Sequence, residues 1–562
     1  MKWTYAAVFL IFSLKSFSQY KVPENYFDDP LDIPLVLAGS FGELRSNHFH
    51  SGLDIKTQQH EGLPVHAAAE GFVSRINISH YGYGKALYIQ HPNGYTTVYG
   101  HLRNFSPEIE AYVQKKQYEK ESYEIELFPS AQELKVDRGQ LVANSGNTGG
   151  SGGPHLHFEI RDGQQRPMNP LMFGVEIKDS RTPLVQALYA YPIGDEAHVN
   201  GSAQRQKINL IQQADGSFIS PKLEACGEIG FGITTVDQMD AAPNQNGVYR
   251  IEAAANGNQL FQADFQKFSF AESRNINKLI DYGFYTQQHH RIQKLFVEPS
   301  NPLSIYSVVD HEGLLNVQDS LSYNYVIKVT DYSGNQRVVN IPIQGKMQSN
   351  VVPKEDKTTD FFVEAGKAAN FEGNGIDVYF PKNVLYDDAY LDIAFEDEKV
   401  KVHEDIIPLK SDFTVGFDVS KYTPEDRKQL FIATLNKWGN PSYSTTYKDG
   451  ERFTTKSRNF GTFTLATDDT APKVVPVNFR DGQWISNNTD LKVKISDDLS
   501  GINSYRATVN GKFILMEYEY KKNLLTHDFS DGVVTDTENH LKVEVIDNVG
   551  NTTTYEATFF RK

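Results

Sequence analysis

The chain has 562 residues, of which 39% are hydrophobic, 22% charged and 12% aromatic. Domains mostly hold about 100–200 residues, so we expect three or four of them, and this composition excludes a mainly disordered chain. The formal net charge of −16 argues against general binding of nucleic acid, because phosphate backbones are bound by basic surfaces. Cys226 is the single cysteine, which excludes an intrachain disulfide and a thiolate zinc site. Any metal must therefore be held by histidines and carboxylates.

The first eighteen residues have the pattern of a signal peptide. An apolar run at 5–14 is followed by small residues at −3 and −1, Ser16 and Ser18. The run is shorter than the roughly 20 residues that cross a bilayer, and no other stretch predicts a transmembrane anchor. We expect residues 1–18 to direct export, to the periplasm or cell envelope of a Gram-negative bacterium, to the cell surface, or into the medium.

Residues 19–175 alternate short apolar runs with glycine-rich turns, which predicts an antiparallel β-domain. One stretch departs from this pattern, at 106–121. Ser106 suits the N-cap, Pro107 suits the first helical position, and early glutamates precede later lysines. We predict a surface helix inserted between two strands.

The rest of the chain reads as almost entirely β, so the predicted fold class is mainly β. We expect about three β-sandwiches, at 176–346, 358–467 and 470–562. Two segments resemble each other: each has a strand, a D-x-x-G-N turn and a returning strand, at Asp331–Asn335 and Asp547–Asn551. This pattern is typical of the last hairpin of an immunoglobulin-like sandwich.

No ligand of the sandwiches can be identified from their sequence. Acidic clusters such as 497–501 are interpreted as turns rather than calcium sites. The sandwiches are suited to position the first domain, to cover its active site, or to bind the wall or an envelope protein partner.

Metal-capable side chains concentrate in two short segments of the first domain. His50 and Asp54 are four residues apart, and His155 and His157 are two apart. Because residues i, i+2 and i+4 of a strand share a face, two neighbouring strands can bring three ligands to one ion. Zinc accepts imidazole nitrogen and carboxylate oxygen, and a catalytic site leaves its fourth position to water. His48 forms a second H-x-H pattern, but only His50 is followed by the x-Gly-x-Asp frame.

The chain from about 41 to 169 resembles the M23 peptidases, the LytM/lysostaphin-type zinc endopeptidases that cut peptides of the bacterial cell wall. Several separated motifs occur in the family's order, over roughly a quarter of the chain. They are Phe41-Gly-Glu-Leu-Arg45, the HxxxD motif His50–Asp54, the segment Val98-Tyr-Gly-His101-Leu, Ser145-Gly-Asn-Thr-Gly149, and the HxH motif His155–His157.

The resemblance implies roles for five residues. His50, Asp54 and His157 would bind one Zn²⁺ per chain, and His101 and His155 would be the catalytic pair. Two imidazoles beside zinc can accept the proton of the attacking water and protonate the leaving amine. Arg45 is a candidate for orienting the site or meeting a substrate carboxylate.

The leading hypothesis is therefore an exported zinc metallo-endopeptidase that hydrolyses peptide cross-links of peptidoglycan. Two alternatives stay open. One is a non-catalytic LytM-like scaffold or amidase activator, and the other is a zinc peptidase that acts on a protein. All five residues are present, and no long heptad coiled coil of the kind that activators often carry is visible, which favours the enzyme.

Overall fold

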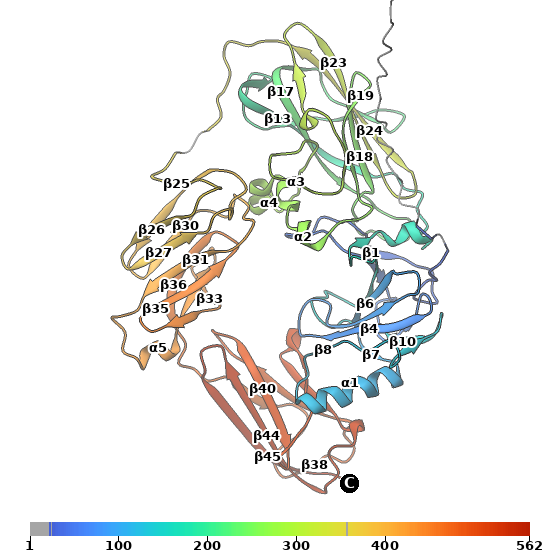
Figure 1. The fold of residues 1–562 in the computed structure, drawn as a ribbon, viewed down its shortest axis with the longest axis vertical. Coiled ribbons are helices and arrows are strands. Elements are labelled where there is room, and N and C mark those ends of the chain that lie inside the picture. The colour runs from blue at the N-terminus through green and yellow to red at the C-terminus, as the bar shows by residue number, and fades with distance from the viewer. Residues whose placement is uncertain (1–21, 24, 356–357) are drawn as a thin grey trace, which may run out of the picture.

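The computed structural model describes residues 22–23, 25–355 and 358–562, so the predicted signal peptide at 1–18 lies outside the described residues. Four β-rich bodies follow one another around a ring (Figure 1). They are called here the first domain (25–175), the second (176–346), the third (358–467) and the fourth (470–562). None of the helices in the described part of the chain combines the length and apolarity needed to cross a membrane.

The first domain is built on an antiparallel sheet with the order β1-β2-β11-β6-β5-β4-β8. The strands are β1 (Leu37–Gly39), β2 (Leu53–Lys56), β4 (Gly71–Ile78), β5 (Lys85–Gln90), β6 (Thr96–Leu102), β8 (Ile125–Leu127), β9 (Lys135–Val136), β11 (His155–Arg161) and β12 (Pro167–Met168). A smaller sheet, β3-β10-β7, is formed by Pro64–His66, Leu141–Asn144 and Asn104–Phe105. Central strands β5, β6 and β11 are almost wholly buried, which places their side chains in a fixed framework.

The helix predicted at 106–121 is present as α1, Pro107–Lys120. Ile109, Val113 and Gln117 are its buried residues, one turn apart, and they attach it to the domain. Ser106 has the extended backbone of an N-cap, but its hydroxyl makes no capping hydrogen bond. A short 3₁₀ helix, η1 (Pro170–Phe173), ends the domain.

The second domain is a sheet with the order β14-β13-β17-β24-β23-β18-β19-β21. Its strands are β13 (Leu184–Val199), β14 (Gln206–Ile208), β15 (Ile211–Gln212), β16 (Phe218–Ile219), β17 (Leu223–Val236), β18 (Arg250–Ala255), β19 (Asn258–Asp264), β20 (Gln293–Lys294), β21 (Tyr306–Val309), β22 (Leu315–Val317), β23 (Ser322–Thr330) and β24 (Gln336–Gly345). Three short helices, α2 (Phe270–Ser273), α3 (Ile276–Leu279) and α4 (Tyr282–Gln288), lie at the end of this domain that faces the first and third domains (Figure 1).

The first and second domains share one hydrophobic core. The ring of Phe49 lies 5.3 Å from that of Phe268 and 6.0 Å from that of Phe265, centroid to centroid. Gly42 has a φ of +75°, and a Cβ there would lie 2.8 Å from the Cβ of Phe265. Only glycine allows so close an approach of the two domains at this turn.

The third and fourth domains each have a core of their own. The third has sheets β26-β27-β31-β35-β34 and β29-β30-β36-β32-β33, with β25 and β28 paired beside them. Its elements are β25 (Phe361–Val363), β26 (Ala369–Gly373), β27 (Ile376–Phe380), β28 (Ala389–Leu391), β29 (Ile393–Glu396), β30 (Lys399–Val402), β31 (Phe413–Asp418), α5 (Asp426–Gln429), β32 (Leu430–Leu435), β33 (Pro441–Tyr443), β34 (Tyr447–Asp449), β35 (Arg452–Ser457) and β36 (Gly461–Thr467).

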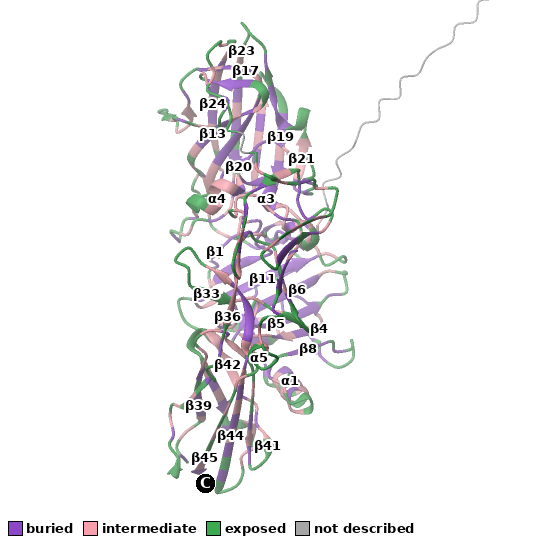
Figure 2. Ribbon diagram, turned by 90° about the vertical axis from the view of Figure 1, so that its left-hand side faces the viewer, coloured by how far each residue is buried: buried purple, intermediate pink, exposed green. Residues whose placement is uncertain are grey.

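The fourth domain has sheets β37-β39-β43-β42 and β38-β45-β44-β40-β41. Its strands are β37 (Lys473–Pro476), β38 (Gln483–Trp484), β39 (Asp490–Ser496), β40 (Ile502–Val509), β41 (Lys512–Phe513), β42 (Glu517–Glu519), β43 (Leu524–Asp528), β44 (Glu538–Asp547) and β45 (Thr552–Phe560). Short 3₁₀ turns, η3 (Tyr520–Lys522) and η4 (Phe529–Asp531), follow β42 and β43. Buried residues follow the strands of these sheets and exposed ones the loops (Figure 2), so the chain is mainly β, as its sequence predicts.

The fourth domain closes the ring against the first. The hydroxyl of Tyr118, on α1, bonds Asp531 and accepts from the backbone N–H of Leu515 at 3.3 Å. Lys85 Nζ, buried at the interface, lies 2.9 Å from Glu517 Oε2. The helix that the sequence predicts on the surface is therefore partly covered by a domain about 400 residues further along the chain.

Candidate metal centre

Neighbouring strands place the candidate ligands opposite one another. β2 pairs antiparallel with β11, and Asp54 is the register partner of His157. Directly opposed residues of a pair point to the same face of the sheet. β6 flanks β11 on its other side, where Gly100 is opposite His157, so the absence of a side chain at 100 leaves room beside the imidazole.

His50 comes from the turn that precedes β2, and the second domain supports this turn. The backbone N–H of Phe49 donates to Ser273 Oγ at 2.9 Å, and the N–H of Gly247 donates to Ser40 Oγ at 2.9 Å. The carbonyl of Ser40 in turn accepts from His50 Nδ1 at 2.7 Å. The orientation of this imidazole therefore depends on contacts with residues about 200 positions away.

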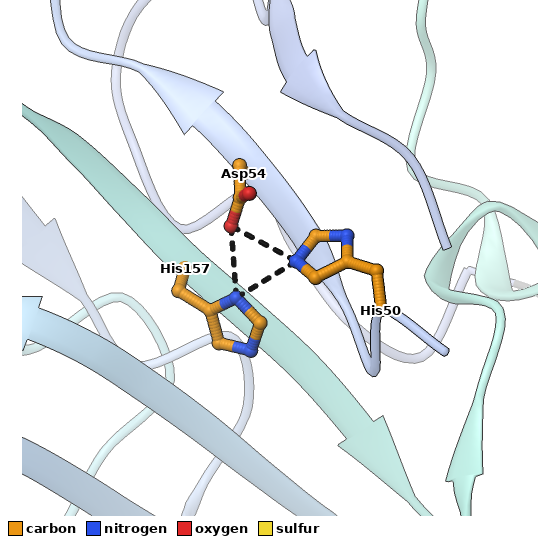
Figure 3. Close-up of side chains that lie close together, drawn as sticks. All are labelled: His50, Asp54 and His157. Atoms are coloured by element: carbon orange, nitrogen blue, oxygen red, sulfur yellow. Dashed lines mark hydrogen bonds and ion pairs between the residues drawn. The ribbon is translucent and has the colours of Figure 1, made fainter. Parts of the chain in front are cut away.

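Three acceptor atoms converge between the turn and the two strands (Figure 3). His50 Nε2 lies 3.0 Å from Asp54 Oδ1 and 3.2 Å from His157 Nδ1, and the latter two atoms are 2.9 Å apart. Because His50 Nδ1 donates to a carbonyl, Nε2 of the neutral ring carries a lone pair. His157 Nε2 bonds Glu159 Oε1 at 2.8 Å, which leaves a lone pair on Nδ1. Lone pairs so close repel one another unless a proton or a cation lies among them.

The electrostatics of the group favour a positive charge at this point. Burial alone would raise the pKa of Asp54, but the neighbouring histidines hold it well below its usual range. Burial alone would lower the pKa of His157, but hydrogen bonds to Asp54 and Glu159 raise it to about 9. A proton and a metal ion compete for these lone pairs. Two imidazole nitrogens and one carboxylate oxygen, all buried, are a donor set that fits zinc.

Glu159 supports the group from behind, and the sequence interpretation missed it. Its carboxylate is fully buried and accepts from His157, from the hydroxyl of Tyr83 at 2.5 Å and from Arg161 Nε at 2.6 Å. A buried carboxylate that receives the far ring nitrogen fixes the tautomer of a metal-binding histidine. The signal was available, because residues 157 and 159 are i and i+2 on one strand and share a face.

The two remaining histidines of the prediction lie beside the group. The ring of His101 is 4.7 Å from that of His155, and His155 Nε2 is 3.4 Å from Asp54 Oδ1. His101 Nδ1 donates to the carbonyl of Thr148 at 2.8 Å, and His155 Nδ1 donates to the carbonyl of Gly153 at 2.8 Å. Each neutral ring therefore keeps its Nε2 lone pair.

His101 has an unusual backbone for its residue type, with a φ of +58° near the end of β6. This left-handed conformation is uncommon outside glycine and occurs often at functional sites. Burial and the neighbouring histidines lower the pKa of His101 to about 3, so its imidazole is neutral at neutral pH.

A cleft of about 880 Å³ opens beside the acceptor atoms, and Asp54 and His155 border it. Arg45 lines the cleft, and its Nη2 donates to Asp54 Oδ2 at 2.9 Å. Ala241 and Pro243, in the loop 237–247 of the second domain, also line the cleft. The second domain thus contributes to the walls of the cleft, which the sequence alone did not indicate.

The structure brings together all five predicted residues, namely His50, Asp54, His101, His155 and His157. His48 points elsewhere, since its Nδ1 bonds the carbonyl of Ser46 at 2.8 Å. The x-Gly-x-Asp frame therefore selects the histidine that reaches the group.

Comparisons with known proteins agree with this geometry. Residues 48–118 and 127–170 match peptidase family M23, and 360–468, which nearly coincide with the sandwich predicted at 358–467, match a Zu5-like domain. The chain is 34% identical over 128 residues to the DD-carboxypeptidase/endopeptidase Mpg of Neisseria meningitidis, covering 23% of each chain. It is 32% identical over 131 residues to the peptidoglycan DD-endopeptidase ShyA of Vibrio cholerae, covering 23% of this chain and 24% of that one.

The matched segment spans about a quarter of the length of these curated relatives. Among solved structures, the catalytic domain of lysostaphin from Staphylococcus simulans is similar at 22% identity, over 24% of this chain and 87% of that one, with a TM-score of 0.18. The part of the chain that holds His50, Asp54 and His157 is a peptidase family M23 domain, and a Zu5-like domain follows further along the chain.

Proposed function

We propose that the protein is a zinc metallo-endopeptidase that hydrolyses peptide cross-links of bacterial peptidoglycan. The observation that carries this proposal is the convergence of three buried lone-pair atoms, all within 3.2 Å of one another, beside two further histidines. His50, Asp54 and His157 would hold the ion. Zinc bound there would lower the pKa of a water molecule toward about 7 and polarise the scissile carbonyl.

His101 and His155 have the geometry of a proton-handling pair. Their Nδ1 atoms are held by backbone carbonyls, so each neutral ring has a lone pair on Nε2 that can accept a proton from the attacking water, and in His155 this nitrogen also lies 3.4 Å from Asp54 Oδ1. The same nitrogen then donates that proton to the leaving amine or hydrogen-bonds the developing oxyanion. Such groups contribute about 10²–10⁴-fold to a hydrolysis rate.

The cleft suits an acidic peptide. Arg45 and Lys56 line it, and the side chain of Arg45 is 37% exposed although it pairs with Asp54. Arg45 Nε also lies 3.1 Å from Glu43 Oε1, so a substrate carboxylate would bind at the remaining N–H groups of a guanidinium that already pairs with two carboxylates. Wall stem peptides carry such carboxylates, and relatives over this segment include DD-endopeptidases. A wall substrate also places the protein outside the inner membrane, as the predicted signal peptide implies.

Digestion of purified cross-linked muropeptides by the mature chain, with zinc quantified in the same sample, tests the proposal. We expect dimers to be converted to monomers, with loss of cleavage in both Asp54→Ala and His155→Ala, and with loss of zinc only in Asp54→Ala. His60→Ala is the matched control, because His60 is exposed and outside the group. If zinc is bound but muropeptides are not cleaved, the substrate would be a protein instead. If the chain neither binds zinc nor cleaves, the non-catalytic scaffold alternative would remain.

A further inference from the structure

A second group of potential metal ligands lies in the second domain. Asp179, Asp237 and Asp331 each offer a carboxylate oxygen, and these atoms lie within 4.8 Å of one another. Asp179 belongs to the segment that leaves the first domain, Asp237 follows the end of β17, and Asp331 begins the D-x-x-G-N turn between β23 and β24. Three segments far apart in sequence thus place like charges together.

One carboxylate of the cluster is poorly compensated by the protein itself. Asp331 accepts from the backbone N–H and the side-chain amide of Asn335, and Asp179 accepts from the N–H of Arg181. Asp237 and Asp331 are each 2% exposed, but Asp237 Oδ1 is buried without a hydrogen-bond partner among the described residues. Arg181, whose charge acts on Asp237, directs its guanidinium to Gln238 Oε1 at 2.7 Å instead. Burial of an acceptor without a partner is costly, and burial of a carboxylate next to two others is costlier still.

The pKa values report the same conflict. Burial raises the pKa of Asp237, and the charges of Asp179 and Asp331 raise it further, to about 7. Burial also raises the pKa of Asp179 and of Asp331.

A similar cluster in the fourth domain differs from this one in a single member. Asp468, Asp497 and Asp547 also lie within 4.8 Å of one another, and Asp547 begins the other D-x-x-G-N turn. Asp547 is held by its turn as Asp331 is, since its Oδ2 accepts from Asn551 Nδ2 at 2.8 Å and its Oδ1 accepts backbone N–H groups. Both oxygens of Asp468 accept backbone N–H groups, and Asp497 Oδ2 accepts from the N–H groups of Leu499 at 3.2 Å and Gly501 at 2.7 Å. Each carboxylate of the fourth domain thus has partners in the chain, whereas Asp237 Oδ1 in the second domain is buried without one among the described residues.

We propose that Asp179, Asp237 and Asp331 bind a calcium ion, which fixes the loop 237–247 to the segment that leaves the first domain. The donor set consists of carboxylate oxygens, which calcium prefers and zinc does not. Three carboxylates supply between three and six ligand oxygens, and water completes the six to eight that calcium takes at about 2.3–2.6 Å.

The position of the ion gives it a structural consequence. Asp237 and Asn246 close the base of the loop through two backbone hydrogen bonds, at 2.9 and 2.8 Å. Within the loop, Asp240 Oδ1 accepts from the backbone N–H of Ser180 at 3.0 Å, next to Asp179. Ala241 and Pro243, at the tip, line the cleft beside Asp54. A cation at the base of the loop 237–247 therefore fixes part of the cleft wall without contacting His50, Asp54 or His157.

Calcium binding and thermal unfolding of the full, zinc-loaded chain test this inference without any assay of cleavage. In buffer freed of calcium by resin rather than by a chelator, about 1 mM calcium should raise Tm by roughly 2–5 °C, and dialysis should show about one calcium per chain. Asp237→Asn should bind no calcium and show no rise, yet without calcium it should be at least as stable as the wild type, because the buried negative charge is gone. Its zinc content should be unchanged.

Control variants separate the explanations. Asp195→Asn, at an exposed site of β13, should behave as the wild type, and Asp179→Asn gives a second test at a partly exposed ligand if Asp237→Asn does not fold. Equal destabilisation of Asp237→Asn with and without calcium would show a purely structural role and overturn the proposal. Loss of calcium in Asp497→Asn alone would place the ion in the fourth domain, and an equal response to magnesium would refute the choice of calcium. Absence of any bound calcium would overturn the site itself.

Discussion

The first and second domains each hold a group of three candidate metal ligands, and the two groups differ in how the protein balances their charge. Around Asp54 the neighbours are histidines, which hold its pKa well below the usual range despite burial, and Arg45 pairs with its other oxygen. Around Asp237 the neighbours are two more carboxylates, and burial together with their charges raises its pKa to about 7. The first group can be occupied by a proton or by a borderline metal, whereas the second is stabilised only by protonation or by a hard cation. Donor chemistry thus separates the proposed zinc centre from the proposed calcium site.

The largest expected effect is the loss of a ligand from the first group. His157→Ala removes an imidazole that faces both His50 and Asp54, and it removes one of the donors to the buried carboxylate of Glu159. We expect loss of zinc and of all detectable muropeptide cleavage, with the response of Tm to calcium retained. Zinc retained at the wild-type level would show that the ion is held elsewhere.

The next largest effect separates binding of the metal from catalysis. His155→Ala removes a free Nε2 beside the group but not an atom of the three that converge. We expect cleavage to fall by about 10²–10⁴-fold with zinc unchanged, as measured by initial rates and metal content. A fall in zinc parallel to the fall in rate would instead make His155 a ligand.

A smaller effect is expected from changing Glu159, whose carboxylate holds the far ring nitrogen of His157. Glu159→Gln keeps the shape but removes the negative charge that receives His157 Nε2, Tyr83 and Arg161. Outer partners of this kind are worth about 10–100-fold in metal affinity or activity, so we expect zinc to be removed by a weaker competing chelator. Glu124→Gln, at an exposed position in the same domain, is the control. An unchanged zinc affinity would reduce Glu159 to a packing residue.

The smallest effect concerns the domain that closes the ring. Lys521 Nζ contacts the carbonyls of Asn147 and Ser151, on the loop whose Thr148 carbonyl orients His101. Because a hydrogen bond contributes about 1 kcal/mol net, Lys521→Ala should lower kcat by no more than about 5-fold. Lys522→Ala, exposed and adjacent, should leave kcat unchanged. A rise in kcat for Lys521→Ala would show that the fourth domain restrains the enzyme instead of supporting it.

The mainly β fold, the three residues of the first group and the two histidines beside it could be predicted because their signals are local. Strand periodicity places His155 with His157 on β11, and motif order supplies His50, Asp54 and His101. The reason given for His50 was wrong, because it lies in the turn before β2 and not on a strand with Asp54. The contacts that support the group could not be predicted, because they join residues far apart in the sequence, such as Phe49 and Ser273, which are 224 positions apart. The second group could not be predicted from the sequence either, since Asp179, Asp237 and Asp331 lie in separate segments and only Asp331 belongs to a recognisable turn.

The most direct test of the central claim is removal and return of metal on the wild-type chain. Zinc is stripped with a chelator, and cleavage of cross-linked muropeptides is followed as stoichiometric zinc or excess calcium is added back. The account predicts that cleavage disappears on stripping, returns with zinc, and does not return with calcium alone. Cleavage that survives complete removal of zinc, or that calcium alone restores, would contradict it.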